Sequence, residues 1–201
     1  MFLCKNITSK MLYETSRDYL IKINTKDKPF DIFVTNGTIL DRTYNNDFVD
    51  DDNRQYKSIA HCIACRKLKL WGVSQKMLDD CYENFEIENP MTREFQYCDF
   101  ETVLCAKYYK EMNLMPETVR YSWRENYVQI AAEVIMTAIS QNKSMKQLLM
   151  GTGNKVICEV SGSTAWGTDC DDKFLRLAFP KYWQGENGYG QALMIVRQNM
   201  G

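Results

Sequence analysis

The sequence is poor in histidine and carries no excess of charge of either sign. His61 is its only histidine, and 25 basic against 26 acidic residues leave a formal net charge of −1. A near-neutral chain argues against general nucleic-acid binding, which usually needs a basic excess. No apolar run approaches the length of a membrane span, and residues 1–6 lack the apolar core of a signal peptide. We therefore expect a cytoplasmic protein that binds neither nucleic acid nor membrane.

Internal repeats, low-complexity tracts and Pro/Ser-rich linkers are also absent from the sequence. Its 201 residues have the size of one ordinary domain, and a hydrophobic content of 45% is enough to form a core. We therefore expect a single domain over residues 1–201. The sequence predicts no oligomeric state.

Metal ligands are scarce as well. The eight cysteines of a cytoplasmic protein are expected to be reduced thiols. Cys62 and Cys65 form the only C-x-x-C pair, and a structural zinc site needs a second close pair or several histidines. Residues 50–52 are three aspartates, but they lack the twelve-residue pattern of a calcium loop. We expect no metal and no cofactor.

The pattern of apolar residues, caps and breakers predicts an α+β protein with helices packed around a small sheet. Ser58 is a favoured N-cap for a helix that ends before Gly72. The β-branched segment 156–160 predicts a buried strand, and residues 1–33 predict one or two more. Residues 43–55 are rich in Asn and Asp and predict an exposed loop. Further helices are predicted at residues 75–85, 100–112, 116–139 and 144–150.

A glycine-rich turn leads into the last apolar segment, which ends at Arg197. Glycine adopts backbone conformations that other residues resist, and the first N–H groups of a helix suit an anion. The turn therefore predicts a phosphate held by Asn187 and the backbone of residues 188–190, with Arg120 or Arg197 as counter-charge. For Arg197 an ordinary surface position is the alternative.

Four blocks of the sequence, taken in order, resemble the NADAR family, also called YbiA-like. Residues 56–67 are similar to the family's aromatic-x-T/S-x-E-H helix with a later lysine, and His61 and Lys67 match it. Arg120 and Trp123 are similar to its R-x-x-W pair. Residues 148–153 with the following strand are similar to its L-L-x-T-G block.

The fourth block is Trp166-Gly167 with residues 185–197, similar to the family's W-G pair and G-x-N-x-x-G-x-x-L-M-x-x-R segment. The resemblance implies a NADAR-like domain in which residues 1–55 are divergent and residues 74–115 are an insertion. Family members known in phages, and a composition rich in Lys, Asn and Tyr, favour a phage or an AT-rich bacterium as source.

The family contains N-glycosidases that act on ADP-ribose-type and riboflavin-pathway compounds. Two of its acids are missing here. Ala60 stands where the family has a glutamate, and residues 162–165 lack the aspartate that precedes its W-G pair. Loss of one general acid or base commonly lowers a rate by about 10²–10⁴. The candidates to substitute are Glu159, Asp169 and Glu186.

The resemblance implies a single cleft lined by the matching blocks. Lys67 and His61 are its catalytic residues only if the protein is active. Otherwise His61 is a core histidine, Lys67 a solvated lysine near a helix end, and Trp123 a core residue. The residues expected to bind the ligand are Lys67, Arg120, Trp123, Trp166, Gly167, Glu186, Asn187, Gly190 and Arg197.

Three functions follow from the retained frame and the missing acids. The first is a protein that binds an ADP-ribose-type nucleotide or nucleotide signal, with little or no catalysis and a sequestering role. The second is an active N-glycosidase that cleaves an ADP-ribosyl or riboflavin-pathway compound with a substitute carboxylate. The third is a structural or interaction protein with a vestigial pocket, whose insertion at 74–115 binds a partner.

Overall fold

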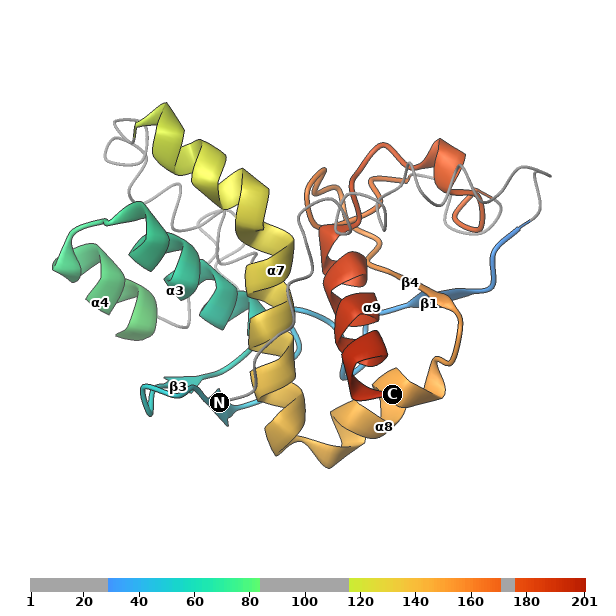
Figure 1. The fold of residues 1–201 in the computed structure, drawn as a ribbon, viewed down its shortest axis with the longest axis horizontal. Helices are drawn as coiled ribbons and strands as arrows, with labels where there is room; N and C mark the ends of the chain where they lie inside the picture. The colour runs from blue at the N-terminus through green and yellow to red at the C-terminus, as the bar shows by residue number, and fades with distance from the viewer. Residues whose placement is uncertain (1–28, 84–115, 171–175) are drawn as a thin grey trace, which may run out of the picture. The chain divides into compact units, whose positions relative to one another are not determined.

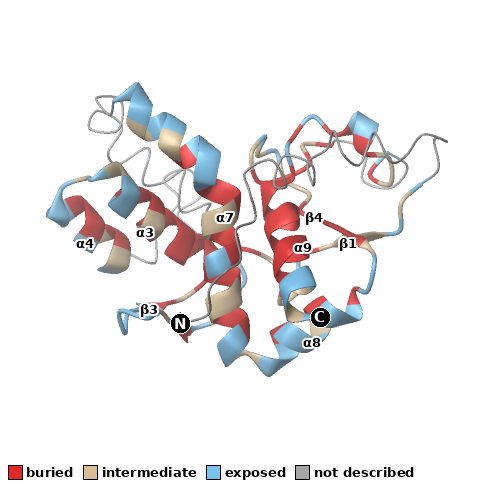
Figure 2. Cartoon of the chain, in the orientation of Figure 1, coloured by how far each residue is buried: buried red, intermediate tan, exposed pale blue. Residues whose placement is uncertain are grey.

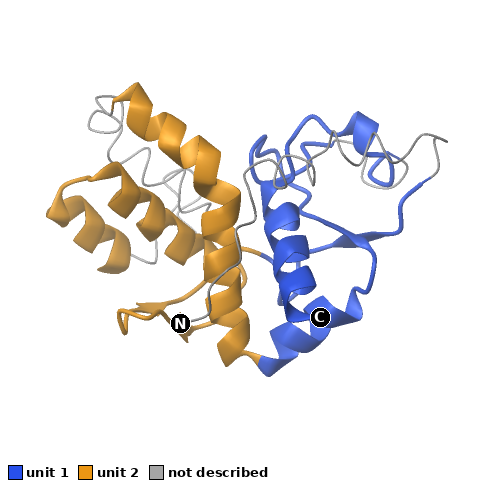
Figure 3. Cartoon of the chain, in the orientation of Figure 1, with its two compact units in different colours: residues 1–41, 143–201 blue, residues 42–142 orange. Residues whose placement is uncertain are grey.

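The computed structural model describes residues 29–83, 116–170 and 176–201. These residues cluster into two compact units, shown in Figure 3. Unit 1 is drawn from residues 1–41 and 143–201, and unit 2 from residues 42–142. Both units combine helices with short strands (Figure 1), which confirms the predicted α+β class. In the parts of the chain that the structure describes, no helix has the length and apolarity needed to cross a membrane.

In its described residues, unit 2 contains a hairpin and three helices. Strands β2 (Phe48–Val49) and β3 (Gln55–Tyr56) pair antiparallel, and helices α3 (Ile59–Trp71), α4 (Gln75–Glu83) and α7 (Glu117–Gln141) follow. Helix α3 packs against both α4 and α7. The predicted helices at 75–85 and 116–139 are therefore confirmed within the described range, and the one at 100–112 lies outside it.

Helix α3 begins and ends as its sequence predicts. The hydroxyl of Ser58 accepts a hydrogen bond from the His61 N–H over 3.1 Å, which satisfies a donor of the first turn. Gly72 follows the last turn with a left-handed φ of 65°, a conformation that glycine adopts without strain. Most of the helix is buried, including residues 59–65.

The hairpin corrects one prediction, because residues 43–55 are not only an exposed loop. The Asp50 carboxylate accepts hydrogen bonds from the N–H groups of Asp52 and Arg54, each at 3.0 Å, and so closes a tight turn. Its other oxygen accepts a hydrogen bond from the Tyr56 hydroxyl at 2.8 Å. An aspartate that bonds its own following backbone favours a turn, and this turn brings β2 and β3 into register.

Unit 1 is built around a parallel pair of strands. Strand β1 (Ile32–Val34) pairs with β4 (Val156–Cys158), and Phe33 lies opposite Ile157. Helix α8 (Lys143–Gly151) precedes β4, and the short 3₁₀ helix η1 (Pro180–Tyr182) precedes helix α9 (Gly188–Met200). Helix α9 packs on β4. The described strands thus form two separate two-stranded sheets.

The core of unit 1 lies under α9, which is buried over residues 188–196 (Figure 2). The side chain of Asn36 continues the β1–β4 pairing beyond the strands. It donates to the Val160 carbonyl over 3.0 Å and accepts from the Val160 N–H over 2.7 Å. The predicted strand at 156–160 is confirmed over residues 156–158, and the predicted helix at 144–150 is confirmed. Of the strands predicted within 1–33, only β1 falls among the described residues.

Candidate functional site

The glycine-rich turn before α9 is fastened to the W-G loop by its backbone. The N–H groups of residues 186–189 donate to the carbonyl oxygens of residues 164–167 over 2.7–3.2 Å. The N–H groups of Gly188 and Tyr189 were predicted to hold a phosphate. They instead donate hydrogen bonds within unit 1, so the turn both begins α9 and fixes it to the W-G loop. We call these four backbone hydrogen bonds the clasp.

Asn187 is the centre of this clasp. It is 1% exposed and adopts a left-handed conformation with φ 55° and ψ 40°. Its side-chain N–H group donates to the Ile157 carbonyl over 2.9 Å, and its side-chain oxygen accepts from the Glu159 N–H over 3.1 Å. Both partners lie at the end of β4, so Asn187 ties the start of α9 to that strand.

The glycines of the motif are explained by close packing. A Cβ atom on Gly190 would overlap the Ile157 carbonyl oxygen and the Asn187 side chain. A Cβ on Gly185 would overlap the backbone of Gly167, and a Cβ on Gly167 would overlap Ser161. Three of the family's motif positions are therefore glycine because backbone approaches backbone there.

Three acids were candidates to replace the missing ones, and their burial differs. Glu159 is 5% exposed at the end of β4, whereas Asp169 is half-buried and Glu186 is exposed. Trp166, expected to contact a ligand, is only 3% exposed. Within the described ranges, the buried hydroxyl of Thr168 has no hydrogen-bond partner. Of the three acids, Glu159 is therefore the only buried one.

Arg197 closes the connection between α8 and β4. Its Nη1 group donates to the Thr152 hydroxyl over 2.6 Å and to the Lys155 carbonyl over 2.9 Å. Burial lowers the pKa of its guanidinium group. Arg197 is therefore more than a surface charge, because it holds two segments of unit 1 together.

Lys67 lies in unit 2 between two indole rings. Its side chain is 7% exposed, and its Nζ atom lies 4.6 Å from the ring centre of Trp71 and 5.2 Å from that of Trp123. A cation within about 6 Å of an aromatic ring centre is attracted by the ring's electrons. We call these three residues the lysine–tryptophan cluster. The burial of Lys67 excludes the alternative of a solvated lysine at a helix end.

Trp71 belongs to this cluster although it lies in none of the family-like motifs. Its Nε1 atom is buried and has no hydrogen-bond partner within the part of the chain that the structure describes. The signal was present in the sequence, because positions four apart on a helix face the same side, and Lys67 and Trp71 have that spacing. Trp123 is also a core residue that is 9% exposed. Its ring is tilted against that of Tyr127, and the two ring centres are 6.4 Å apart.

His61 is a hydrogen-bonded core histidine in this structure. Its ring is 1% exposed, Nε2 lies 2.8 Å from the Cys81 carbonyl oxygen, and Nδ1 accepts from the Lys57 N–H at 3.4 Å. These partners assign the ring proton to Nε2. Burial lowers the pKa of the imidazole, and the nearby Lys57 lowers it further, so the neutral form is favoured.

The expected site residues fall into two groups, one in each unit. Lys67, Arg120 and Trp123 belong to unit 2, where Arg120 is exposed on α7. Trp166, Gly167, Glu186, Asn187, Gly190 and Arg197 belong to unit 1. A single cleft lined by both groups stays a prediction, as does the contact of each residue with a ligand.

Comparisons with known proteins identify the family of the chain. The sequence profile of the NADAR domain matches residues 35–201. Among solved structures, the NMR structure of the Escherichia coli protein YbiA is similar, with a TM-score of 0.57 and 14% sequence identity over 86% of each chain. At this identity the likeness concerns the fold. No curated protein matches the sequence.

Proposed function

Because the chain belongs to the NADAR family, we propose that it binds an ADP-ribose-type nucleotide or nucleotide-derived signal with little or no turnover. The observation that carries this proposal is the lysine–tryptophan cluster, whose Lys67 lies on the same helix as Ala60. The cationic group of the family's helix is kept and buried, while the acid of that helix is missing.

The chemistry of the cluster favours an anionic ligand. An ammonium group shielded from water gains more from a negative partner than an exposed one does. The Trp71 indole adds a buried N–H donor that has no acceptor among the described residues. A phosphate group offers several acceptor oxygens, and it can therefore accept from the Lys67 ammonium and from this N–H together.

The chemistry of catalysis is weakly supported by contrast. Cleavage of an N-glycosidic bond needs a proton for the leaving base and a negative group near the sugar carbon. The first turn of α3 contains no acidic residue, and Ala60 is 5% exposed within the core of unit 2. Residues 160–166 contain no acid either. With two acids missing, we expect a ligand to be held without efficient cleavage.

An active N-glycosidase is the second candidate, and Glu159 is the observation that favours it. Its carboxyl group is buried, and Asn187 fixes its backbone N–H. A positioned buried acid of this kind is a frequent catalytic group. The third candidate, an interaction protein, rests on residues 74–115, most of which lie outside the described ranges.

Calorimetric titration with ADP-ribose tests the binding, and Lys67→Met is the informative variant because it keeps the aliphatic stem. We expect it to weaken binding by about 1–3 kcal/mol, the usual effect of losing a charged hydrogen-bond partner. The matched control is Lys69→Met on the same helix, since the Lys69 side chain is 63% exposed and pairs with Asp52 at 3.5 Å. Equal affinities of both variants would remove Lys67 from the site.

A product assay on ADP-ribosylated guanine and on riboflavin-pathway intermediates separates the two candidates. We expect no multiple turnover by the unmodified protein. If the unmodified protein showed robust turnover, and Glu159→Gln lost it while still binding ADP-ribose, the proposal of a binding protein would be wrong and the protein would be an N-glycosidase. The glutamine keeps the size of the side chain, so loss of activity reports the carboxyl group.

A further inference from the structure

Two buried thiols of unit 2 touch each other and take no part in the proposed binding of a nucleotide. Cys65 lies on α3 and Cys81 on α4, and both are fully buried. Their Sγ atoms are 3.0 Å apart. No sequence motif indicates this pair, because fifteen residues separate the two cysteines and the only C-x-x-C pair is Cys62 with Cys65.

A shared metal ion is the first possibility to consider. The nearest ligand atoms of His61, Cys65 and Cys81 all lie within 4.8 Å of one another. However, two thiolates on a tetrahedral zinc ion, with Zn–S bonds of about 2.3 Å, lie about 3.8 Å apart. The observed Sγ–Sγ distance is 3.0 Å, so the two sulfur atoms would have to move apart by about 0.8 Å to share a zinc ion. His61 also engages both ring nitrogens within the protein, with Cys81 and Lys57.

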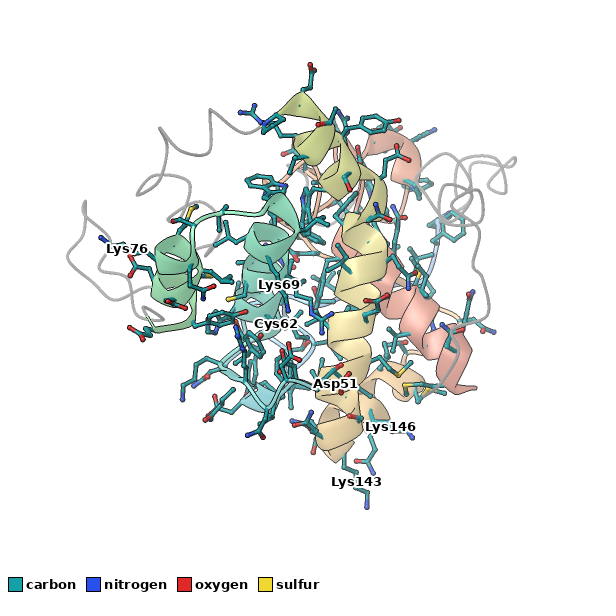
Figure 4. All side chains as sticks on the ribbon, turned by 60° about the vertical axis from the view of Figure 1, so that its left-hand side comes forward. Asp51, Cys62, Lys69, Lys76, Lys143 and Lys146 are labelled. Carbon is teal, nitrogen blue, oxygen red and sulfur yellow. The ribbon has the colours of Figure 1, made fainter. Side chains whose placement is uncertain are left out.

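We propose instead that Cys65 and Cys81 form a reversible disulfide that joins α3 to α4. A disulfide has an S–S bond of about 2.05 Å, so the two sulfur atoms need to approach by only about 1 Å. Each thiol is already the other's neighbour, and no further residue has to leave the space between them. Cys62, one turn earlier on α3 (Figure 4), has its thiol near Arg66 and Tyr56.

The oxidant is a small-molecule disulfide. The thiolate of one cysteine attacks a sulfur of the oxidant, which forms a mixed disulfide and releases one small thiolate. The second cysteine then attacks the protein sulfur of the mixed disulfide and releases the second thiolate. The two cysteine protons pass through solvent to the two released thiolates. One oxidant disulfide is thereby reduced to two thiols as one protein disulfide forms.

The reaction starts from an opened state of α4. Burial raises the pKa of the Cys65 thiol and its contact with Cys81 raises it further, so the closed protein holds few thiolates there. Helix α4 is only nine residues long, and Gln75, Lys76 and Asp79 on its outer side are exposed. Short helices with little buried surface open at low free energy. Oxidation is therefore slow, and it fixes α4 once it has occurred.

The disulfide acts on the helix that carries the lysine–tryptophan cluster, because Cys65 and Lys67 are two residues apart on α3. Lys67 contacts the indole of Trp123 on α7, whereas Cys65 contacts α4. The disulfide thus clamps the opposite side of α3 from the cluster. This inference rests on the thiol pair alone and holds whether or not a nucleotide binds.

Peptide mapping of the unmodified protein after exposure to oxidised glutathione tests the proposal directly. We expect a loss of two free thiols and a disulfide-linked peptide pair that contains Cys65 and Cys81. We also expect the melting temperature to rise by about 5–10 °C, because the bond closes a loop of about fifteen residues, and to return on reduction. Cys81→Ser should abolish both effects, and the matched control Cys62→Ser should keep them.

Several results would overturn the proposal. One is a mapped disulfide that joins other cysteines, and another is an unchanged thiol count after prolonged exposure. Stoichiometric zinc or copper in the purified protein, measured by mass spectrometry and lost in Cys81→Ser, would assign the cluster to a metal. Because mapping uses the unmodified chain, poor folding of a variant leaves the test intact.

Discussion

The imidazole of His61 lies in the core of unit 2, where a positive charge is unfavourable. Its pKa in the folded state is lowered from the ordinary 6.5, first by burial. In the unfolded chain the ring takes up its proton near pH 6.5. The unfolded state therefore binds more protons than the folded state as the pH falls below about 6.5, and acidification favours unfolding.

We predict that the unfolding free energy of the protein decreases as the pH is lowered from 7 toward 5. The slope is at most about 1.4 kcal/mol per pH unit, the value for one proton. Because the chain has no other histidine, the variant His61→Gln should lose this slope while its amide keeps a donor for the Cys81 carbonyl. Urea unfolding at several pH values measures the effect. An equal slope in both proteins would attribute it to carboxyl groups.

A second prediction at the scale of single residues concerns Asn187. The variant Asn187→Ala loses two buried hydrogen bonds and keeps a left-handed backbone, so we expect it to lower stability by about 2–4 kcal/mol. Asn53 is the matched control, because it has a similar φ of 59° on an exposed turn. Asn53→Ala should cost only about 1 kcal/mol. Equal losses in urea unfolding would contradict the bridging role of the Asn187 side chain.

The sequence indicated which residues match the family's motifs, but it did not indicate which residues they contact in the folded protein. Lys67, Trp123 and Asn187 were all selected from motif spacing, and the structure buries all three. Their neighbours in space were not predictable in the same way. Trp71 is near Lys67 by helix geometry, whereas Cys81 reaches Cys65 only through the packing of α4 on α3. Local spacing determines the first contact, and tertiary packing determines the second.

At the scale of elements, the close approach of α9 to β4 depends on Gly190. The variant Gly190→Ala places a methyl group against the Ile157 carbonyl oxygen, so α9 must shift from the strand. We expect a loss of about 1–3 kcal/mol, the usual effect of overpacking a core. The control is Gly151→Ala in α8, where an added Cβ has no heavy atom within 4 Å.

The control variant should be neutral or stabilise the protein by up to about 1 kcal/mol, because alanine restricts the unfolded chain. Thermal and urea unfolding of both variants give the comparison. If Gly190→Ala were as stable as Gly151→Ala, the close packing of α9 on β4 would not limit that position.

Elements with strong local signals were predicted well. The helix from Ser58 to Gly72 has a favoured N-cap and a glycine that stops it, and the structure confirms both. The β2–β3 hairpin was missed because its strands are two residues each. A strand of two residues is too short to show an alternating pattern. The hairpin is instead indicated by Asp50, whose carboxylate bonds the backbone that follows it.

At the scale of the whole molecule, the two units differ in the number of chain segments that form them. Unit 2 is one continuous segment, whereas unit 1 takes residues from before and after it. The partner of β4 is β1, and the Tyr189 hydroxyl donates to the Leu40 carbonyl over 2.9 Å. The C-terminal part of unit 1 is therefore incomplete without residues that precede residue 42.

We predict that a fragment of residues 42–142 folds by itself and that a fragment of residues 143–201 does not. The first keeps its hairpin and the packing of α3 on α7, and the second lacks β1. Circular dichroism with urea titration should show cooperative unfolding for the first fragment only. A peptide of residues 29–41 added to the second fragment should restore structure. Cooperative unfolding of residues 143–201 alone would contradict the prediction.

The pairing of β1 with β4 also has a consequence for the order of events on the ribosome. Asn36 and its partner Val160 are 124 positions apart, and translation adds about 5–20 residues per second. Strand β1 is therefore synthesised about 6–25 seconds before the strand that will pair with it. During that interval residues 42–142 of unit 2 are synthesised, while the apolar residues of β1 have no partner strand. A nascent chain in this state is the form of the protein that a chaperone would meet.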